Sequence, residues 1–282
     1  MRVGVVGGGL MGSGIAEVCA RSGVDVTVVE ADDERATRSQ AAIERSLERA
    51  IKAGKLDETG RRDTTDRLAF TSSLTDVAGA DAAIEAVVED EDLKRDVFKR
   101  LDELLPDAEF LASNTSSVPI MKLGAETTHP ARVIGLHFFN PVPVLPLVEV
   151  VRSIMTSEET VKRATSFAEQ TLGKVTIHSQ DRAGFVVNAL LIPYLLSAIR
   201  MYESGFASKE DIDEGMIKGC AHPMGPLQLA DLIGLDTLQA VSESLYEEFK
   251  DTASVAPALL NRMVEAGLLG RKSGRGFYDY SA

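Results

Sequence analysis

His137 and Glu149 are the residues of this sequence whose types and surroundings are best suited to acid–base chemistry. They lie within two apolar, β-favouring runs, 133–139 and 145–151, which are joined by a proline-rich segment that also carries Asn140. Prolines cannot donate to a sheet ladder, so an irregular connection is expected there. An imidazole and a carboxylate are costly to bury unless they pair, and such a pair is the usual apparatus of a positioned general base. The structural alternative is that His137 caps a strand end while Glu149 pairs with a remote arginine.

A glycine-rich turn near the start of the chain is the second chemical signal. Gly7, Gly9 and Gly12 form Gly-x-Gly-x-x-Gly between an apolar run, 3–6, and a helical pattern. Gly7 permits the tight turn, Gly9 lets the backbone approach a pyrophosphate, and Gly12 allows helix and strand to pack closely. The helix N-terminus, opened by Leu10 and Met11, offers free N–H groups to the phosphates.

Glu30 follows a second strand pattern, 24–29, about twenty residues after the glycines. An acid at this place accepts hydrogen bonds from the adenosine ribose and repels a 2′-phosphate, so the sequence predicts NAD rather than NADP. The alternative is a solvated acid at a strand end.

The densest cationic region lies on the polar side of a predicted helix, 36–53, and in the turn that follows it. It could be a solvated helix face, because Glu44 and Glu48 are interspersed there. It could also receive a multiply phosphorylated ligand through charge-assisted hydrogen bonds. The polar and basic residues concerned are Arg45, Ser46, Arg49, Lys52, Lys55, Arg61 and Arg62.

Strand and helix patterns alternate through the first two thirds of the chain, which favours a mostly parallel, Rossmann-type sheet with helices on both faces. Functional groups should gather at the carboxyl ends of such strands. Three groups of polar residues follow strands: Glu85 with Glu89 and Lys94; the cluster 113–117, which contains Ser116; and His137 with Asn140. The 113–117 cluster could instead be a polar turn that caps the next helix. The predicted strands are 68–71, 82–86, 110–113, 133–139 and 174–177, and helices are expected at 93–105 and 157–172.

From Phe185 onward only helical patterns appear, so we place a domain boundary near Gly184, with domains 1–183 and 184–282. The second domain is predicted to be all-α. Asn188 opens its first apolar helix and could be the N-terminal cap. These helices are very apolar for an exposed unit, which suggests a second subunit and hence a homodimer. The expected helices are 188–203, 209–218, 228–232, 238–249 and 258–266, and the aromatic residues at the end of the tail 270–278 indicate that it docks.

The composition and net charge of the chain argue against several classes of function. The 282 residues are 44% hydrophobic and 26% charged, which is typical of a globular protein with one or two domains. A net charge of −13 argues against general binding to nucleic acid or to an anionic membrane. The first residues enter a strand pattern at once, without the order of a signal peptide, and Cys19 and Cys220 show no metal-ligand spacing. We therefore expect a cytoplasmic protein without a metal.

Seven segments, taken in order, resemble the L-3-hydroxyacyl-CoA dehydrogenase family over essentially the whole chain. The glycine-rich loop occurs in many dehydrogenases, whereas the Ser-Asn-Thr-Ser-Ser, His-Phe-Phe-Asn-Pro and Pro-Met-Gly-Pro sequences are specific to this family when they occur together. The segments are 7–16, 84–89, 113–117, 137–142, 184–188, 222–226 and 270–278.

The resemblance implies NAD-dependent oxidation of an (S)-3-hydroxyacyl-CoA, with 3-hydroxybutyryl-CoA as the expected substrate. It implies that His137 takes the hydroxyl proton, that Glu149 supports the imidazolium, and that Ser116 and Asn188 hydrogen-bond the reacting oxygen and the nearby carbonyl. By the same resemblance Ser46 contacts coenzyme A, and the family expectation is a dimer through the helical domain. The positions that match NAD contacts are Glu30, Glu89, Lys94, Ser116, Asn140 and Lys272.

The sequence departs from the family pattern at three positions. Ala53 stands where a coenzyme A-contacting lysine is found, so Lys52 or Lys55 would have to substitute. Ala183 and Ala189 replace a frequent proline and a frequent arginine. Two other functions stay open: a non-catalytic NAD-binding family member, and a dehydrogenase of free β-hydroxy acids. The latter enzymes use a lysine in the helical domain, and the helix after Asn188 offers none before Lys209.

Overall fold

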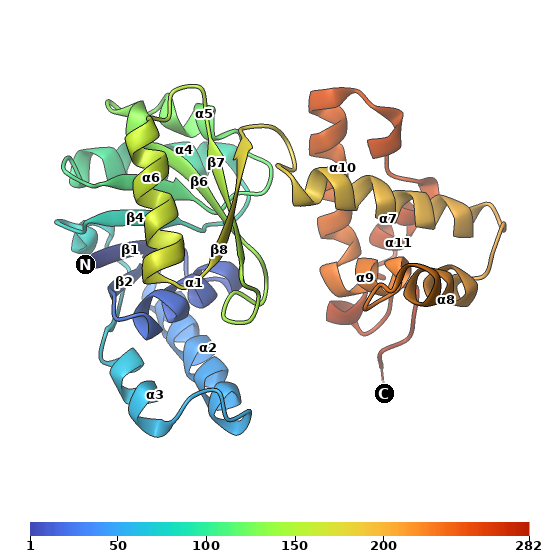
Figure 1. The fold of residues 1–282 in the computed structure, drawn as a ribbon, viewed down its shortest axis with the longest axis horizontal. Helices are drawn as coiled ribbons and strands as arrows, with labels where there is room; N and C mark the ends of the chain where they lie inside the picture. The colour runs from blue at the N-terminus through green and yellow to red at the C-terminus, as the bar shows by residue number, and fades with distance from the viewer. Residues whose placement is uncertain (282) are drawn as a thin grey trace. The chain divides into compact units, whose positions relative to one another are not determined.

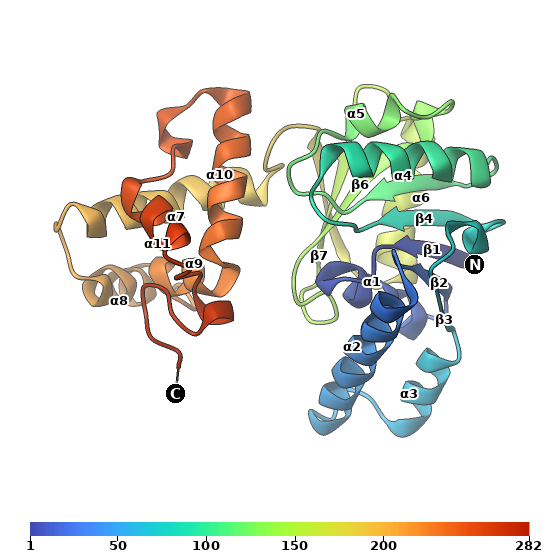
Figure 2. The same ribbon diagram turned by 180° about the vertical axis from the view of Figure 1, so that it is seen from behind.

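A computed structural model describes residues 1–281 of the chain. Two compact units follow from its internal contacts, one spanning Met1–Asp181 and the other beginning at Arg182. Figures 1 and 2 show the first unit in blue to yellow-green and the second in yellow to red. Each unit has its own hydrophobic core, so each is described by itself.

The first unit is built on an eight-stranded sheet with the order β3-β2-β1-β4-β5-β6-β7-β8. The order reverses at β1, as in doubly wound nucleotide-binding folds, so the predicted Rossmann-type sheet is confirmed. Most neighbouring strands are parallel, and β6 and β7 pair antiparallel. The strands are β1 (Arg2–Val6), β2 (Asp25–Val29), β3 (Leu68–Thr71), β4 (Ala82–Glu85), β5 (Phe110–Ser113), β6 (Val133–Phe138), β7 (Leu147–Arg152) and β8 (Val175–Gln180).

Helices cover both faces of this sheet. α6 crosses in front of the strands in Figure 1, and α4 does so in the reverse view of Figure 2. Parallel strands covered on both sides are apolar along their length, and β4, β5 and β6 are buried at every position. The helices are α1 (Leu10–Arg21), α2 (Asp33–Lys52), α3 (Glu58–Thr65), α4 (Glu91–Leu104), α5 (Ile120–Gly124) and α6 (Glu158–Ser166), with 3₁₀ turns η1 (Leu74–Val77) and η2 (Pro130–Arg132).

Side-chain caps set the starts of several helices. Asp32, Asp90 and Ser157 each accept the N–H three residues ahead, so α2 and α4 begin two or three residues earlier than their apolar periodicity indicates. α6 ends earlier than expected and continues as a π-helical turn, Phe167–Thr171.

The helix α3 was not predicted. Its sequence, Glu-Thr-Gly-Arg-Arg-Asp-Thr-Thr, has no apolar stripe, and only Thr64 is buried. Asp57 caps it by accepting the N–H of Gly60 at 2.7 Å. Local capping and contact with α1 therefore hold a helix that periodicity cannot reveal.

The second unit is helical in the part that the structure describes, as expected. Its core joins Leu195 and Ile199 of the first helix to Leu227, Leu238 and Leu260 of the helices that follow. The elements are α7 (Val187–Glu203), α8 (Lys209–Cys220), α9 (Pro226–Ile233), α10 (Leu235–Phe249), η4 (Thr252–Ser254), α11 (Ala258–Glu265) and η5 (Arg271–Ser273). Throughout residues 1–281, no helix combines the length and the apolar character needed to cross a membrane.

The C-terminal tail docks on this unit, as its aromatics predicted. The fully buried carboxylate of Asp231 accepts the N–H groups of Phe277 and Tyr278, both at 2.9 Å. Burial raises the pKa of Asp231, and these hydrogen bonds oppose that effect. Tyr278 also donates its hydroxyl to Asp213 at 2.9 Å, so two buried acids anchor the end of the chain.

Candidate functional site

The candidate site lies at the carboxyl edge of the parallel strands. Val6, Val29, Glu85 and Ser113 are the last residues of β1, β2, β4 and β5, and the register places Val6 beside both Val29 and Glu85. In doubly wound sheets ligands bind at this edge, where the strand order reverses. The glycine-rich loop and the polar clusters expected from the sequence all begin here.

The geometry of the glycine loop fits a dinucleotide. Gly7 has φ +94°, and a Cβ there would lie 2.7 Å from the backbone of Ala86. A Cβ on Gly12 would lie 1.7 Å from the carbonyl oxygen of Gly7, so the helix start can pack this closely only without a side chain. Gly9 has no atom within 4 Å of where its Cβ would be, and no side chain caps α1 at this residue. The open space and uncapped N–H groups suit a pyrophosphate.

Glu30 lies against the same loop. Its Oε1 accepts the N–H of Gly8 at 2.8 Å and the hydroxyl of Ser39 at 3.0 Å. Ser39 also hydrogen-bonds the carbonyl oxygen of Gly8 at 2.7 Å. Glu30 is thus held in place by the protein rather than solvated freely, and its position at the end of β2 suits ribose recognition.

Two carboxylates and one ammonium group form a compact cluster at the end of β4. Lys94 Nζ lies 2.7 Å from Glu85 Oε1 and 3.2 Å from Glu89 Oε2. The side chains of Lys94 and Glu85 are 1% and 0% exposed, whereas that of Glu89 is 39% exposed. The cluster therefore extends from the sheet interior to the surface of the site. Of its members, only Glu89 has substantial surface for a ligand in the described structure.

Glu89 holds the loop after β5. Its Oε1 accepts the N–H groups of Ser116 and Ser117 at 3.0 Å, and it also accepts the hydroxyls of Thr115 and Ser117. Burial would raise the pKa of Glu89, but the charge of Lys94 and these hydroxyl contacts hold that pKa below its ordinary value. The backbone at Ser116 is anchored in this way, and its own hydroxyl is not among the Glu89 contacts.

His137 and Glu149 are brought together by the β6–β7 pairing. They are direct cross-strand partners, and the imidazole Nδ1 lies 2.6 Å from Glu149 Oε2. The two side chains are 9% and 0% exposed, and the ring of Phe139 packs on the imidazole with centroids 4.6 Å apart. Asn114, in the loop after β5, accepts the N–H of Phe138 at 2.9 Å and so ties that loop to the histidine strand.

Asn140 lies in the turn that leaves β6 and is exposed. This turn is held by Lys174, whose Nζ donates to the carbonyl oxygens of Val142 at 2.6 Å and Leu145 at 2.8 Å. The connection is irregular, as its prolines predict.

The basic helix expected to hold coenzyme A is α2. Ser46 is half-buried, and its side chain hydrogen-bonds Glu17, an acid of α1 that is 1% exposed. Burial raises the pKa of Glu17, an effect that Ser46 and Arg21 oppose. Lys52 ends α2 and is exposed, and Lys55 is exposed in the turn beyond it. The structure therefore places these lysines at the surface and Ser46 against α1.

The remaining two predicted site residues belong to the second unit. Asn188 is half-buried within the first turn of α7, and the helix is capped at Val186. The alternative of Asn188 as the N-terminal cap is therefore wrong, because the residue lies inside the helix. Lys272 forms an ion pair with Asp236 at the start of α10.

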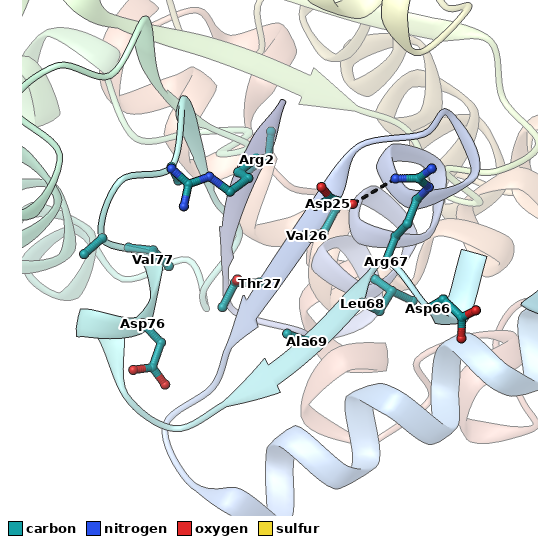
Figure 3. A pocket seen from close by; sticks show the side chains of 13 residues that line it. Arg2, Asp25, Val26, Thr27, Asp66, Arg67, Leu68, Ala69, Asp76 and Val77 are labelled. Carbon is teal, nitrogen blue, oxygen red and sulfur yellow. Dashed lines mark hydrogen bonds and ion pairs between the residues drawn. The ribbon is translucent and has the colours of Figure 1, made fainter. Parts of the chain in front are cut away.

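A separate pocket of about 250 Å³ opens at the other end of the strands (Figure 3). It is lined by Arg2, Asp25 and Leu68, the first residues of β1, β2 and β3. Its two arginine side chains are already engaged: the guanidinium of Arg2 donates to the carbonyl oxygen of Gly79, and that of Arg67 pairs with Asp25 (Figure 3). It lies away from the carboxyl edge and is not the candidate site.

Comparison with known proteins places this site in a family. Residues 2–182 match the model of the 3-hydroxyacyl-CoA dehydrogenase NAD binding domain, and residues 184–280 match that of the 3-hydroxyacyl-CoA dehydrogenase C-terminal domain. The chain belongs to the 3-hydroxyacyl-CoA dehydrogenase family. The resemblance deduced from the sequence is thereby confirmed, as are NAD as the cofactor and the assignment as an oxidoreductase of this family.

Individual proteins are similar to this chain over its full length. A 3-hydroxybutyryl-CoA dehydrogenase of Mycobacterium tuberculosis is 56% identical over 280 residues, covering 99% of this chain and 98% of that protein. The solved structure of (S)-3-hydroxybutyryl-CoA dehydrogenase from Ralstonia eutropha is 45% identical, with a TM-score of 0.94 over 100% of this chain and 99% of the other. A diketoreductase acting on dicarbonyl compounds is 31% identical, with a TM-score of 0.83 over 99% of both chains.

Several supporting residues were missed from the sequence. Glu17 is buried in α1, a helix with buried residues around most of its circumference, and Ser39 faces the glycine loop from α2. An acid at an apolar position of a helical pattern is a usable signal, because its burial requires partners. No comparable signal marks Ser39, since a serine in a polar helix is ordinary.

Proposed function

We propose that this member of the 3-hydroxyacyl-CoA dehydrogenase family interconverts (S)-3-hydroxybutyryl-CoA and acetoacetyl-CoA. The observation that carries the proposal is the buried His137–Glu149 pair in a chain with an NAD binding domain. The names of the Mycobacterium and Ralstonia relatives support the four-carbon substrate.

His137 acts as the general base in this proposal. Its Nδ1 faces Glu149, and in this proposal Nε2 is the nitrogen that takes the proton of the substrate hydroxyl. NAD, when bound, would supply the acceptor for the hydride that leaves the carbon bearing this hydroxyl. Glu149 supports the imidazolium once the proton has moved, because a buried charge needs a buried counter-charge. In the reverse direction the imidazolium returns the proton to the oxygen.

Ser116 and Asn188 are proposed to hydrogen-bond the reacting oxygen and the neighbouring thioester carbonyl. The anchoring of the Ser116 backbone by Glu89 supports this role, since a preorganised donor costs little reorganisation. The NAD contacts proposed for Glu30, Glu89, Asn140 and Lys272 rest on their correspondence to the family pattern. Lys94 matches the same pattern, and because its side chain is 1% exposed we propose that it acts on NAD through Glu89. Glu89 has the exposed surface that such a contact needs.

The coenzyme A moiety is proposed to lie along α2, near Ser46, with Lys52 or Lys55 contributing charge. Both lysines are exposed and close in sequence to the helix end, in a chain that is otherwise acidic. We also propose a cytoplasmic homodimer that pairs through the helical unit. Exposed apolar side chains of that unit, among them Leu190 and Phe206, support an interface there.

The reaction is tested by following NADH absorbance with acetoacetyl-CoA and, in parallel, with free acetoacetate. We expect rapid turnover of the thioester and little of the free acid. Equal turnover of the free acid would show that the enzyme does not require a coenzyme A thioester as its substrate. Tight NADH binding without turnover of any short 3-oxoacyl-CoA would favour a non-catalytic NAD-binding protein. A series of 3-oxoacyl-CoA chain lengths then tests the four-carbon preference.

A further inference from the structure

Glu85 is a carboxylate with no exposed surface that has no role in the proposed chemistry. It ends β4, directly beside the β1 strand that leads into the glycine loop. An ionised carboxylate in such a place is costly unless several partners satisfy it. Its partners therefore indicate why this part of the structure keeps a buried charge.

Glu85 contacts three different elements at once. Its Oε1 accepts from Lys94 of α4 at 2.7 Å and from the N–H of Val87 at 2.7 Å. Its Oε2 accepts the hydroxyl of Ser113, the last residue of β5, at 2.6 Å. The helix, the turn after β4 and the neighbouring strand are thus joined by one side chain.

Lys94 links the buried Glu85 to a residue nearer the protein surface, Glu89. Besides Glu85, its ammonium group contacts Glu89 at 3.2 Å and the carbonyl oxygen of Val87 at 3.4 Å, which gives an acceptor for each of its three protons. Glu89 in turn holds the 115–117 segment through Thr115, Ser116 and Ser117. A continuous set of contacts runs from the buried end of β4 to the loop that carries Ser116.

We propose that Glu85 is a positioning residue for the NAD site, which fixes Lys94 so that Glu89 and the 115–117 segment are preorganised for the cofactor. Val87 lies at the centre of this arrangement, because Glu85 and Lys94 bind its N–H and its carbonyl oxygen. The turn it belongs to packs against Gly7, whose missing side chain leaves room for the Val87 backbone. Glu85 therefore helps to order two segments: the turn after β4, which packs against Gly7, and the 115–117 segment after β5.

The test is a double-mutant cycle in NADH affinity, which does not depend on turnover. NADH fluorescence titrations give the dissociation constant for the full-length protein, for Glu85→Gln, for Glu89→Gln and for the double variant. Glutamine keeps the shape and an accepting oxygen of Glu85 and removes its charge. Glu91→Gln is the matched control, because it removes the same charge from an acid of α4 whose ion pair is with Lys122 and not with Lys94.

Glu85→Gln is expected to raise the NADH dissociation constant roughly tenfold, the size of an ordinary coupling between contacting residues, and Glu91→Gln much less. In the double variant the two effects on the NADH dissociation constant should be less than multiplicative, because Glu85 acts in part through Lys94 on Glu89. Wild-type NADH affinity in a folded Glu85→Gln protein would overturn the proposal and leave a purely structural role. Fully multiplicative effects in the double variant would also overturn it.

A second variant keeps the proposal testable if Glu85→Gln does not fold. Glu85→Asp keeps the charge but is one methylene shorter, so it cannot reach Lys94 and Ser113 with the same geometry. We expect a folded protein with NADH affinity weakened several-fold, and unchanged affinity would count against the proposal. NAD binding is the only premise used here, so failure of acetoacetyl-CoA reduction by the wild-type protein would refute the proposed function and leave this test intact.

Discussion

His137 and Glu149 face each other across an antiparallel pair of strands, with 2.6 Å between Nδ1 and Oε2. Their contact is set by strand register, because a shift of one residue would turn either side chain to the other face of the sheet. Both side chains are buried, and each provides the polar partner that makes burial of the other possible. Backbone hydrogen bonds along two strands thus determine which imidazole nitrogen faces Glu149.

Replacing the proposed base should abolish most of the activity. We expect His137→Ala to lower kcat by roughly 10²–10⁴-fold, the usual contribution of a positioned acid–base group, while NADH affinity changes little. Steady-state rates with acetoacetyl-CoA and NADH titrations measure the two quantities. His129→Ala, at an exposed histidine before β6, is the control and should keep wild-type rates. A mild loss in His137→Ala would exclude it as the base.

Removing the charge of Glu149 should lower kcat less than removing the imidazole of His137 does. In Glu149→Gln the imidazole can still accept a proton, but the imidazolium that forms loses its counter-charge. We therefore expect kcat to fall by less than in His137→Ala, with the dissociation constant for NADH near wild type. The two variants are compared under the same assay conditions. Wild-type turnover in Glu149→Gln would show that the carboxylate does not support the proton transfer.

Two glycines of the loop should respond differently to alanine. A Cβ on Gly12 would collide with the Gly7 carbonyl oxygen, so Gly12→Ala should lower the unfolding temperature as well as NADH affinity. A Cβ on Gly9 meets no protein atom, so Gly9→Ala should keep the wild-type unfolding temperature and lose NADH affinity alone. Thermal unfolding and NADH titration of both variants check this. Full NADH affinity in Gly9→Ala would mean that the pyrophosphate does not approach that residue.

Cofactor choice is expected to depend on Glu30. Glu30→Ala should reduce the preference for NADH over NADPH, because the carboxylate that repels a 2′-phosphate is gone. It should also weaken the binding of NADH itself, since Glu30 accepts the N–H of Gly8 in the glycine loop. The ratio of the NADPH and NADH dissociation constants is the measurement. Ser39→Ala removes a hydrogen bond to Glu30 but keeps the charge of Glu30, so it should leave that ratio unchanged. If the ratio is the same in Glu30→Ala, another residue sets the preference.

Asp102 gives a prediction about stability and pH away from the site. Burial would raise its pKa, but hydrogen bonds from Thr128 and the ion pair with Arg132 hold the pKa below its ordinary value. The stabilisation is therefore present at neutral pH and is lost as pH falls from about 4 through the lowered value. Asp102→Asn should cost roughly 3 kcal/mol of unfolding free energy at pH 7, because the Arg132 side chain, 10% exposed, loses its counter-charge.

Urea unfolding of wild type and Asp102→Asn at pH 7 and near pH 3 tests this dependence. The difference between the two proteins should shrink at the lower pH, where the wild-type carboxyl also takes up a proton. An equal difference at both pH values would show that the charge of Asp102 does not stabilise the fold.

Much of the fold could be deduced from the sequence because its signals are local. Apolar runs of four to six residues separated by amphipathic helices predict a parallel sheet, and Gly7, Gly9 and Gly12 mark the turn where backbone must replace side chain. The same locality explains the failures. α3 has no apolar stripe to reveal it, and Asn188 was considered as a cap because periodicity alone does not locate a helix start to one residue.

The sequence by itself determined which chemical groups are available: one imidazole and one carboxylate in apolar strands, a glycine loop, and polar residues after successive strands. Tertiary structure decided which of them meet. His137 reaches Glu149 through antiparallel register, and Glu85 reaches Lys94 and Ser113 because a helix and two strands end at the same edge. Pairs of buried charges depend on packing between distant segments, and no local pattern records that packing.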